Sequence, residues 1–322
     1  MPMTTWGSTI PNTGALRTHH LSKKLFTAAI AECVFMAHVD VDPDYGPHMG
    51  QSTTLTRISR QAELSDYSLA ETDRIPESQI TVTGKVITAG EFGASVPCTN
   101  LAKVFAHFDL ENATQGELKD QMKLAMDSRA CRAFKLTQLV YVPTGAAAYT
   151  LYTNGTAGTA ALSNMNVFHL ATIRDLLYDD YKVPFADGEC YMGIFRSHGL
   201  RGIKEDPTFE EWRKYKNPEA RNNSEIGKIE QIMIHETNHG GSTLGGFGLN
   251  KVGTNDVLGE GIVFGKDAVR YIEAQAPEIR PGKPDDFNRI TSLCWYGIYE
   301  HSLVWDTANS GEAKVIFVSS ST

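Results

Sequence analysis

The clearest hydrophobic pattern in the chain predicts one long helix. Its apolar side chains recur at spacings of four, three and one residues, as on one face of an α-helix: Leu118, Met122, Ala125, Met126, Ala130, Ala133 and Phe134. Thr114 followed three residues later by Glu117 fits the capping box. The helix is therefore expected over Gln115 to Thr137, about 35 Å long at ~1.5 Å per residue. On its polar face, Lys123 and Asp127 are spaced for an i,i+4 ion pair.

Before this helix, alternating apolar and polar positions predict two strands, at residues 53–59 and 79–92. In the second strand Ile80, Val82 and Val86 fall on one face, and polar side chains fall on the other. The stretch between the strands has few large apolar side chains. Two strands without a core are only marginally stable in water. This limb must therefore lie on the rest of its own chain or on a neighbouring subunit, and the pattern leaves both possibilities open.

The remaining patterns predict a mixture of helices and strands. A polar, breaker-rich arm is expected at residues 1–20, and a helix is expected to start at Ser22 and to carry Phe26, Ala29, Cys33, Met36 and Ala37. Later strands are expected at 139–142, 190–195, 229–234, 295–305 and 314–318, and helices at 167–181 and 198–204. Nine glycines in residues 240–265 indicate a long loop. Without a βαβ regularity, the predicted fold class is α+β.

Composition and charge exclude several classes of protein. The 322 residues are 41% hydrophobic and 21% charged, which is ordinary for a globular protein. The net charge of −8 and the lack of any Lys or Arg run argue against tight nucleic-acid binding. The five cysteines lie far apart without a C-x-x-C pair, which argues against a disulfide framework or a cysteine zinc site. No signal peptide or membrane span is expected, because residues 1–14 are polar and the apolar stretch 25–39 is too short.

One motif suggests an enzyme. His235-Glu236-Thr237-Asn238-His239 matches H-E-x-x-H, in which two histidines one helical turn apart bind zinc and the glutamate is the general base. The preceding residues 229–234 have strand character, however, and Gly240-Gly241 follows at once. On a strand, residues four apart are separated by about 13 Å at ~3.3 Å per residue, too far for one zinc ion. A zinc metallopeptidase is therefore kept only as the alternative function.

No other motif predicts a catalytic or cofactor site. Residues 260–267 approach a phosphate-binding loop, but Glu260 replaces its first glycine and Asp267 replaces its Ser/Thr. The chain has no G-x-S-x-G elbow and no persuasive nucleophile with its base. We therefore expect no catalytic residue, no cofactor and no metal, and we expect that the protein is not an enzyme.

Four segments, in order and spacing, carry a resemblance to a known family. They are Ser22–Phe26 with Gly50–Thr53; Leu69–Pro76 with Ile80–Thr83 and Glu91–Gly93; Leu176–Phe195 with Asp206-Pro207; and Asn222–Glu230 with Ile262–Ala268. Together they resemble the tailed-bacteriophage major capsid proteins of the Hong Kong 97 fold, in particular a podophage-type coat subfamily. The likeness covers roughly residues 20–320. It departs from the family pattern at Thr72, where glycine is usual, and at Phe92, where tyrosine is usual.

The resemblance implies a domain organisation. It places an N-terminal arm at 1–47, an extended β-hairpin loop at 48–97, a peripheral domain with a long spine helix at 98–145, an axial domain at 146–285 and a C-terminal return to the peripheral domain at 286–322. The polar hairpin would then lie across an adjacent subunit. In this alignment Glu236-Thr237 ends a strand, which also argues against zinc.

The resemblance further implies a structural function in the virion. Copies of the chain would assemble in the host cell cytoplasm into hexamers and pentamers of an icosahedral shell around double-stranded DNA. Expected partners are a scaffolding protein, a portal and, as an option, a decoration protein; DNA would be contacted without sequence specificity, and no membrane is involved. A soluble binding module with an exposed hairpin arm is the third hypothesis.

Overall fold

A computed structural model gives the structure of the chain. It describes residues 32–61, 67–69, 71–72, 74–106, 109–156, 161–207, 225–239, 250–252, 255–257, 259–285, 287, 289–306 and 312–321. The predicted arm at residues 1–20 and most of the helix predicted from Ser22 lie outside these residues. From that helix, the structure describes only its last part, where Phe35–His38 form the 3-10 helix η1.

The long helix is confirmed. It is α2 (Leu110–Lys135), with 26 residues. It begins five residues before the predicted start because Asp109, and not Thr114, caps it: the Asp109 carboxylate accepts hydrogen bonds from the backbone amides of Glu111 and Asn112. The Thr114 hydroxyl instead donates to the carbonyl oxygen of Leu110 within the first turn.

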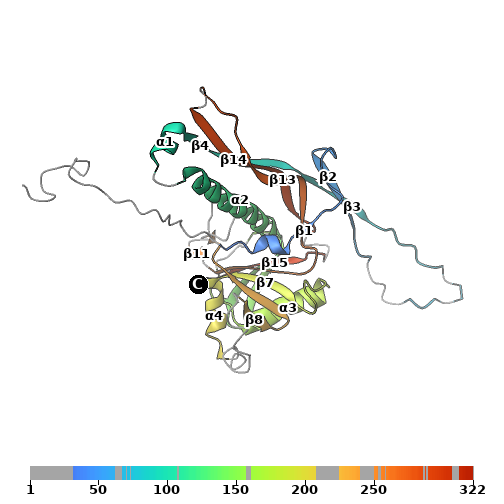
Figure 1. The fold of residues 1–322 in the computed structure, drawn as a ribbon. Coiled ribbons are helices and arrows are strands. Elements are labelled where there is room, and N and C mark those ends of the chain that lie inside the picture. The colour runs from blue at the N-terminus through green and yellow to red at the C-terminus, as the bar shows by residue number, and fades with distance from the viewer. Residues whose placement is uncertain are drawn as a thin grey trace, which may run out of the picture.

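Helix α2 packs against a four-stranded sheet (Figure 1). The strands, in spatial order, are β1 (Asp40–Val41), β13 (Val269–Pro281), β14 (Ile290–Leu303) and β4 (Gly90–Thr99). Arg129 of α2 fixes this packing, because its guanidinium lies 3.7 Å from the ring centroid of Phe92 on β4 and 2.8 Å from the Glu300 carboxylate on β14. The short helix α1 (Asn100–Phe105) links β4 to α2.

A seven-stranded sheet forms the second layer. Its order is β6 (Ala148–Tyr152), β5 (Val140–Gly145), β15 (Val315–Ser320), β12 (Gly259–Phe264), β7 (Tyr191–Arg196), β9 (Ile232–Thr237) and β8 (Glu225–Ile229). The helices near it are α3 (Val167–Asp175), its π-helical extension η2 (Leu176–Asp180), the 3-10 helix η3 (Ser197–Leu200) and α4 (Arg201–Lys204). A small separate hairpin consists of β10 (Asn250–Val252) and β11 (Asn255–Val257).

An aromatic core joins α2 to the seven-stranded sheet and to η1. The Phe134 ring lies 4.6 Å from that of Phe264 on β12 and 6.1 Å from that of Phe35 on η1, measured between centroids. All three side chains are buried. Helix α2 is therefore covered on more than one side. The predicted ion pair of Lys123 with Asp127 is wrong for this reason: Asp127 is fully buried and accepts a hydrogen bond from a backbone amide of η1.

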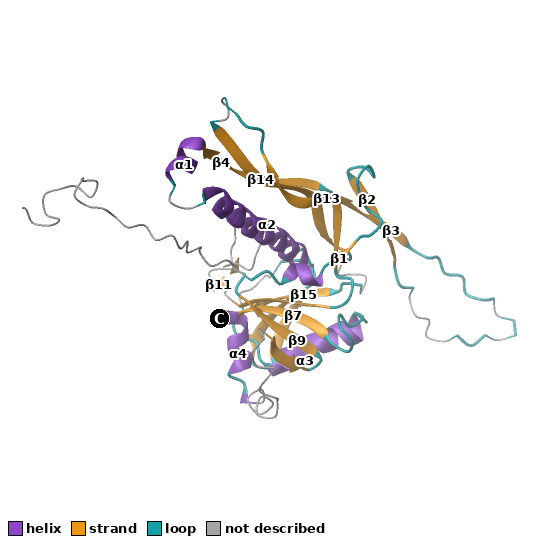
Figure 2. Cartoon of the chain, in the orientation of Figure 1, coloured by secondary structure: helices purple, strands orange, loops and turns teal. Residues whose placement is uncertain are grey.

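The hairpin β2 (Ser52–Ile58) and β3 (Val82–Thr88) forms a sheet of its own. It pairs antiparallel from Ser52 opposite Thr88 to Ile58 opposite Val82. It projects from the end of the four-stranded sheet, with the connecting arm extended away from both layers (Figure 2). The strand predicted at 79–92 is divided at Ala89, where the chain passes from β3 into β4.

One strand prediction and one loop prediction need correction in the second layer. The single strand predicted at 229–234 is divided: Glu230 and Gln231, with φ of 46° and 60°, form the turn between β8 and β9, and residues 232–234 begin β9. The loop predicted at 240–265 contains β10, β11 and the fully buried β12. Glycine serves close packing there: a Cβ on Gly261 would collide with the Phe195 ring of β7.

The chain crosses between the two sheets more often than the predicted domain limits imply. Strand β13 lies within residues 146–285 but pairs in the four-stranded sheet, and β15 lies within 286–322 but pairs in the seven-stranded sheet. Strand β5, within 98–145, also belongs to the larger sheet. The limits drawn from the resemblance stay a prediction, whereas the predicted α+β class is confirmed.

Candidate assembly surfaces

The inner face of the β2–β3 hairpin is tied to the body of the molecule by polar contacts. Asp306 forms ion pairs with Arg57 (2.7 Å) and with Lys85 (2.9 Å). Although partial burial opposes it, the hydrogen bonds from Arg57 and Lys85 hold the pKa of Asp306 below its usual value. Leu55 and Ile87 add a small apolar contact at the hairpin base. The base is therefore fixed, and the hairpin has a defined direction.

The outer face of the same hairpin carries three large apolar side chains that are open to solvent. Ile58, Val82 and Val86 are 63%, 57% and 60% exposed. Ile58 lies directly opposite Val82, and Val86 lies opposite Thr54. The predicted alternation of β3 is thus confirmed in its period. Its inner face carries Lys85 and the buried Ile87, whereas Val82 and Val86 on its outer face are left open to solvent.

The arm beyond the strands continues this exposed apolar character. Its large exposed side chains are Tyr67, Leu69, Ile75 and Ile80. Within the arm, Arg74 forms an ion pair with Glu77 (2.8 Å). The Ser78 hydroxyl donates a hydrogen bond to Gln61 and so joins the two ends of the arm (3.2 Å). We call the outer face of β2–β3 together with this arm, residues 52–88, the hairpin surface.

A second exposed apolar surface lies at the far end of β4, on helix α1. Leu101, Val104 and Phe105 are each at least 70% exposed. With Arg289 and Ile290 they line a shallow groove. We call these three apolar side chains the α1 surface. No local pattern predicts this surface, since a helix of six residues is too short to give a recognisable period.

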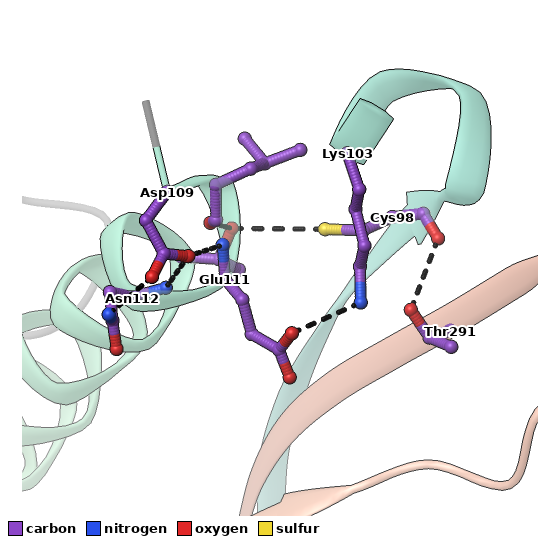
Figure 3. Close-up of polar contacts among 8 residues, drawn as sticks. Cys98, Lys103, Asp109, Glu111, Asn112 and Thr291 are labelled. Carbon is purple, nitrogen blue, oxygen red and sulfur yellow. Dashed lines mark hydrogen bonds and ion pairs between the residues drawn. The ribbon is translucent and has the colours of Figure 1, made fainter. Parts of the chain in front are cut away.

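The α1 surface is held rigidly despite its exposure (Figure 3). The Thr99 hydroxyl caps α1, and Lys103 forms an ion pair with Glu111 at the start of α2 (3.3 Å). The Cys98 sulfur lies 3.8 Å from the Thr114 hydroxyl, and the Thr291 hydroxyl donates to the Cys98 carbonyl oxygen (3.5 Å). These contacts join α1 to α2 and to β4, and β4 in turn to α2 and β14. The apolar side chains are thus presented on a fixed support.

The H-E-x-x-H residues do not form a zinc site. His235 and Glu236 lie on β9, where they pair with Ile194 and Phe195 of β7, and His239 follows the end of the strand. Glu236 forms an ion pair with Lys204 (2.8 Å), and His239 Nε2 lies 3.1 Å from the Ser128 hydroxyl. Among the residues that the structure describes, no three His, Cys, Asp or Glu side chains gather around a possible metal position. The zinc-peptidase alternative is not supported.

The phosphate-loop near-match has a structural explanation. Of its residues 260–267, the first five lie in the buried strand β12, and Glu260 pairs with Lys135 of α2 (3.2 Å). Within the described part of the chain, no helix has both the length and the apolar character of a membrane span.

Comparisons with proteins of known structure identify the fold. No protein-family model matches the chain, and no curated protein matches its sequence. Solved phage capsid structures do match over nearly their full length. The Helicobacter pylori bacteriophage KHP30 capsid gives a TM-score of 0.69 at 12% identity, covering 96% of this chain and 97% of that chain. The cyanophage Pam1 capsid gives 0.68 at 15% identity, covering 97% and 98%.

The capsid of Ralstonia phage GP4 gives a TM-score of 0.66 at 13% identity and covers 98% of each chain. Because sequence identity is this low, the likeness establishes the fold, and the podophage-type subfamily stays a prediction. The chain therefore has the fold of phage capsid proteins, which is the Hong Kong 97-type α+β fold expected from its sequence.

Proposed function

We propose that this chain is the major capsid protein of a tailed phage and acts as a shell subunit without enzymatic activity. The observation that carries the proposal is the outer face of the β2–β3 hairpin, where Ile58, Val82 and Val86 are exposed on a limb that projects from the body. Water-exposed apolar area of this kind is stabilised by burial, at roughly 25 cal/mol per Å². A neighbouring copy would supply the covering surface.

The position of the two apolar surfaces supports assembly into closed rings. The hairpin surface precedes the start of β4, and the α1 surface follows its end. A strand of ten residues spans about 33 Å at ~3.3 Å per residue. Surfaces this far apart contact different neighbours. Such heterologous contacts close into rings when the rotation between subunits is right, and we propose that these rings are hexamers and pentamers.

The net charge of the chain supports a shell that encloses DNA without binding it tightly. The net charge is −8, so the protein and the phosphate backbone repel each other on average. A packaged genome would then stay mobile. We extend the proposal to assembly in the host cytoplasm, with a scaffolding protein, a portal and, where present, a decoration protein as partners.

The test is to image the purified full-length protein by electron microscopy across a range of protein concentrations. We expect rings, tubes or closed shells, because each subunit carries surfaces for at least two neighbours. A chain that stays monomeric at millimolar concentration in the presence of its scaffolding protein would contradict the proposal. So would stoichiometric zinc after dialysis, together with peptide hydrolysis that is lost in His235→Ala.

A further inference from the structure

Three basic side chains gather where β7 ends. Arg196 is the last residue of β7, His198 lies on η3 and Arg201 begins α4. The charges of Arg201 and Arg196 both act on the His198 ring, so the three groups lie close together. Within the described residues, none of the three forms an ion pair with a carboxylate. We call Arg196, His198 and Arg201 the basic cluster.

The acidic side chains near the basic cluster in sequence or in the sheet have other partners. Glu236 on β9 forms its ion pair with Lys204 (2.8 Å), and the Asp206 carboxylate accepts a hydrogen bond from the backbone amide of Val167 (3.2 Å). The Nη1 atom of Arg196 is buried without a hydrogen-bond partner. In a chain with 38 acidic and 30 basic residues, arginines left unpaired are a costly arrangement unless an external anion completes them.

The basic cluster stands on a rigid support. Leu200 and Ile203 are fully buried and belong to the same core cluster as Leu170 of α3. A Cβ on Gly202 would collide with the carbonyl oxygen of Met165, so α4 lies in close contact with the chain before α3. The two short helices are therefore fixed on the face of the seven-stranded sheet that is turned away from α2 (Figure 2).

The position of the basic cluster is suited to an anionic ligand. Strands β7 and β9 are parallel, and Arg196 lies opposite Thr237, so their carboxyl ends are side by side. In sheets with parallel strands, ligands bind outside these ends. Arg201 is exposed, and Arg196 and His198 are half-buried, so the cluster borders solvent. The planar guanidinium group matches two oxygens of one phosphate.

We propose that the basic cluster binds a phosphate group of the DNA backbone on the inside of the shell. The inference rests on the proposed function, because only a shell subunit faces a packaged genome. A phosphate contact carries no sequence information, so binding would not depend on the DNA sequence. With one such site in every copy, the shell would hold DNA through many weak contacts.

The size of the basic cluster sets how strong each contact is. Two arginines neutralise at most about two phosphates, which gives a slope of about −1.8 in a plot of log affinity against log salt concentration. A site of this size binds weakly at physiological salt. The net charge of −8 opposes tighter binding of the isolated subunit.

Filter binding of a short DNA duplex to the full-length protein at about 0.05 M salt tests the inference. In the double variant Arg196→Gln with Arg201→Gln, we expect the affinity to fall by at least about tenfold and the salt slope to fall by about two. The matched control is Lys119→Gln with Lys123→Gln, which removes the same charge from exposed positions of α2. Equal losses in the two double variants, or no binding by the wild type, would overturn the inference.

The His198 ring gives a second, local measurement. Burial, followed by the charges of Arg201 and Arg196, lowers the pKa of His198 in the free protein. A bound phosphate opposes these charges, so the pKa measured by NMR should rise by at least about one pH unit when the DNA duplex is added. Inorganic phosphate at equal ionic strength is the comparison. A rise with inorganic phosphate alone would mean a site for the free ion and would overturn the assignment to DNA.

The variants also separate this inference from the proposed function. Electron microscopy should show the same particles for the wild type and for the variants, because the basic cluster is assigned to DNA and not to a neighbouring subunit. Absence of particles in the wild type would count against the shell function, whereas DNA binding is measured on the same samples independently. If the double variant does not fold, Arg201→Gln alone changes an exposed residue and should lower the salt slope by about one. An unchanged slope there would overturn the inference.

Discussion

At the scale of single residues, the orientation of β3 determines which of its side chains face the body and which stay exposed. An alternating strand normally turns its apolar side chains to the core, but here only Ile87 does so, beside Lys85 and Thr83, while Val82 and Val86 face solvent. The ion pairs of Lys85 and Arg57 with Asp306 set that orientation. A one-residue shift of register would exchange the two faces. The polar contacts at the base therefore determine which surface is offered to a neighbour.

Charge on the outer face should block assembly without unfolding the subunit. In Val86→Lys we expect the free energy of unfolding to change by no more than about 0.5 kcal/mol, because residue 86 is exposed. We expect the protein concentration needed for assembly to rise by at least about tenfold, which corresponds to about 1.4 kcal/mol per contact. Thermal melting and light scattering measure the two quantities. Thr88→Lys places the same charge on the same strand face and is the control. If it raises the protein concentration needed for assembly as much as Val86→Lys does, the apolar side chain of Val86 has no role in assembly.

The hairpin base should loosen in acid through Asp306. Because the pKa of Asp306 is held low in the folded state, its contribution is fully present above the unfolded pKa near 3.8 and is lost as the pH falls below that value. Asp306→Asn should abolish this dependence and speed amide exchange in β2 and β3 at neutral pH. Exchange in α2 should not change. Unchanged amide exchange in β2 of the variant would contradict this prediction and show that the apolar contact of Leu55 and Ile87 holds the hairpin base without the ion pairs.

At the scale of elements, the sequence predicts what repeats locally and misses what depends on contacts from elsewhere. The long helix, β14 and β15 are predicted from their periods because each carries a regular repeat of apolar positions. Strand β12 was hidden by its glycines, which the structure uses for close contact with Phe195. Asp127 looked like a surface residue, and only the packing of η1 on α2 buries it.

The candidate site was only partly predictable for the same reason. The sequence indicated that residues 48–97 lack a core; the structure places β2 and β3 in a separate sheet, whereas residues 90–97 belong to β4 and pair in the four-stranded sheet. The α1 surface carries no period, since its three apolar side chains are adjacent on one short helix. The strand that carries α1 is fixed by a contact between residues 193 positions apart, Thr291 and Cys98, which no local pattern predicts.

The arm should be required for closing particles and dispensable for folding. Replacing residues 61–76 by a short Gly-Asn turn should leave β2 paired with β3 and the melting temperature nearly unchanged, because the described part of this segment forms no helix or strand. Electron microscopy should then show single subunits or open rings in place of shells. Complete shells from the shortened chain would contradict the role assigned to the hairpin surface, and a large fall in melting temperature would mean that the arm stabilises its own subunit.

At the scale of the whole molecule, the charge distribution gives the last prediction. The acidic balance of 38 Asp and Glu against 30 Lys and Arg implies that isolated subunits or rings retain double-stranded DNA weakly. In a filter-binding assay at about 0.15 M salt, where the Debye length is ≈ 8 Å, we expect little DNA retained and no preference between sequences. Strong retention that weakens steeply with added salt would contradict this prediction. It would mean that basic side chains beyond the basic cluster gather on the face that contacts DNA, so that the net charge of the chain does not describe that face.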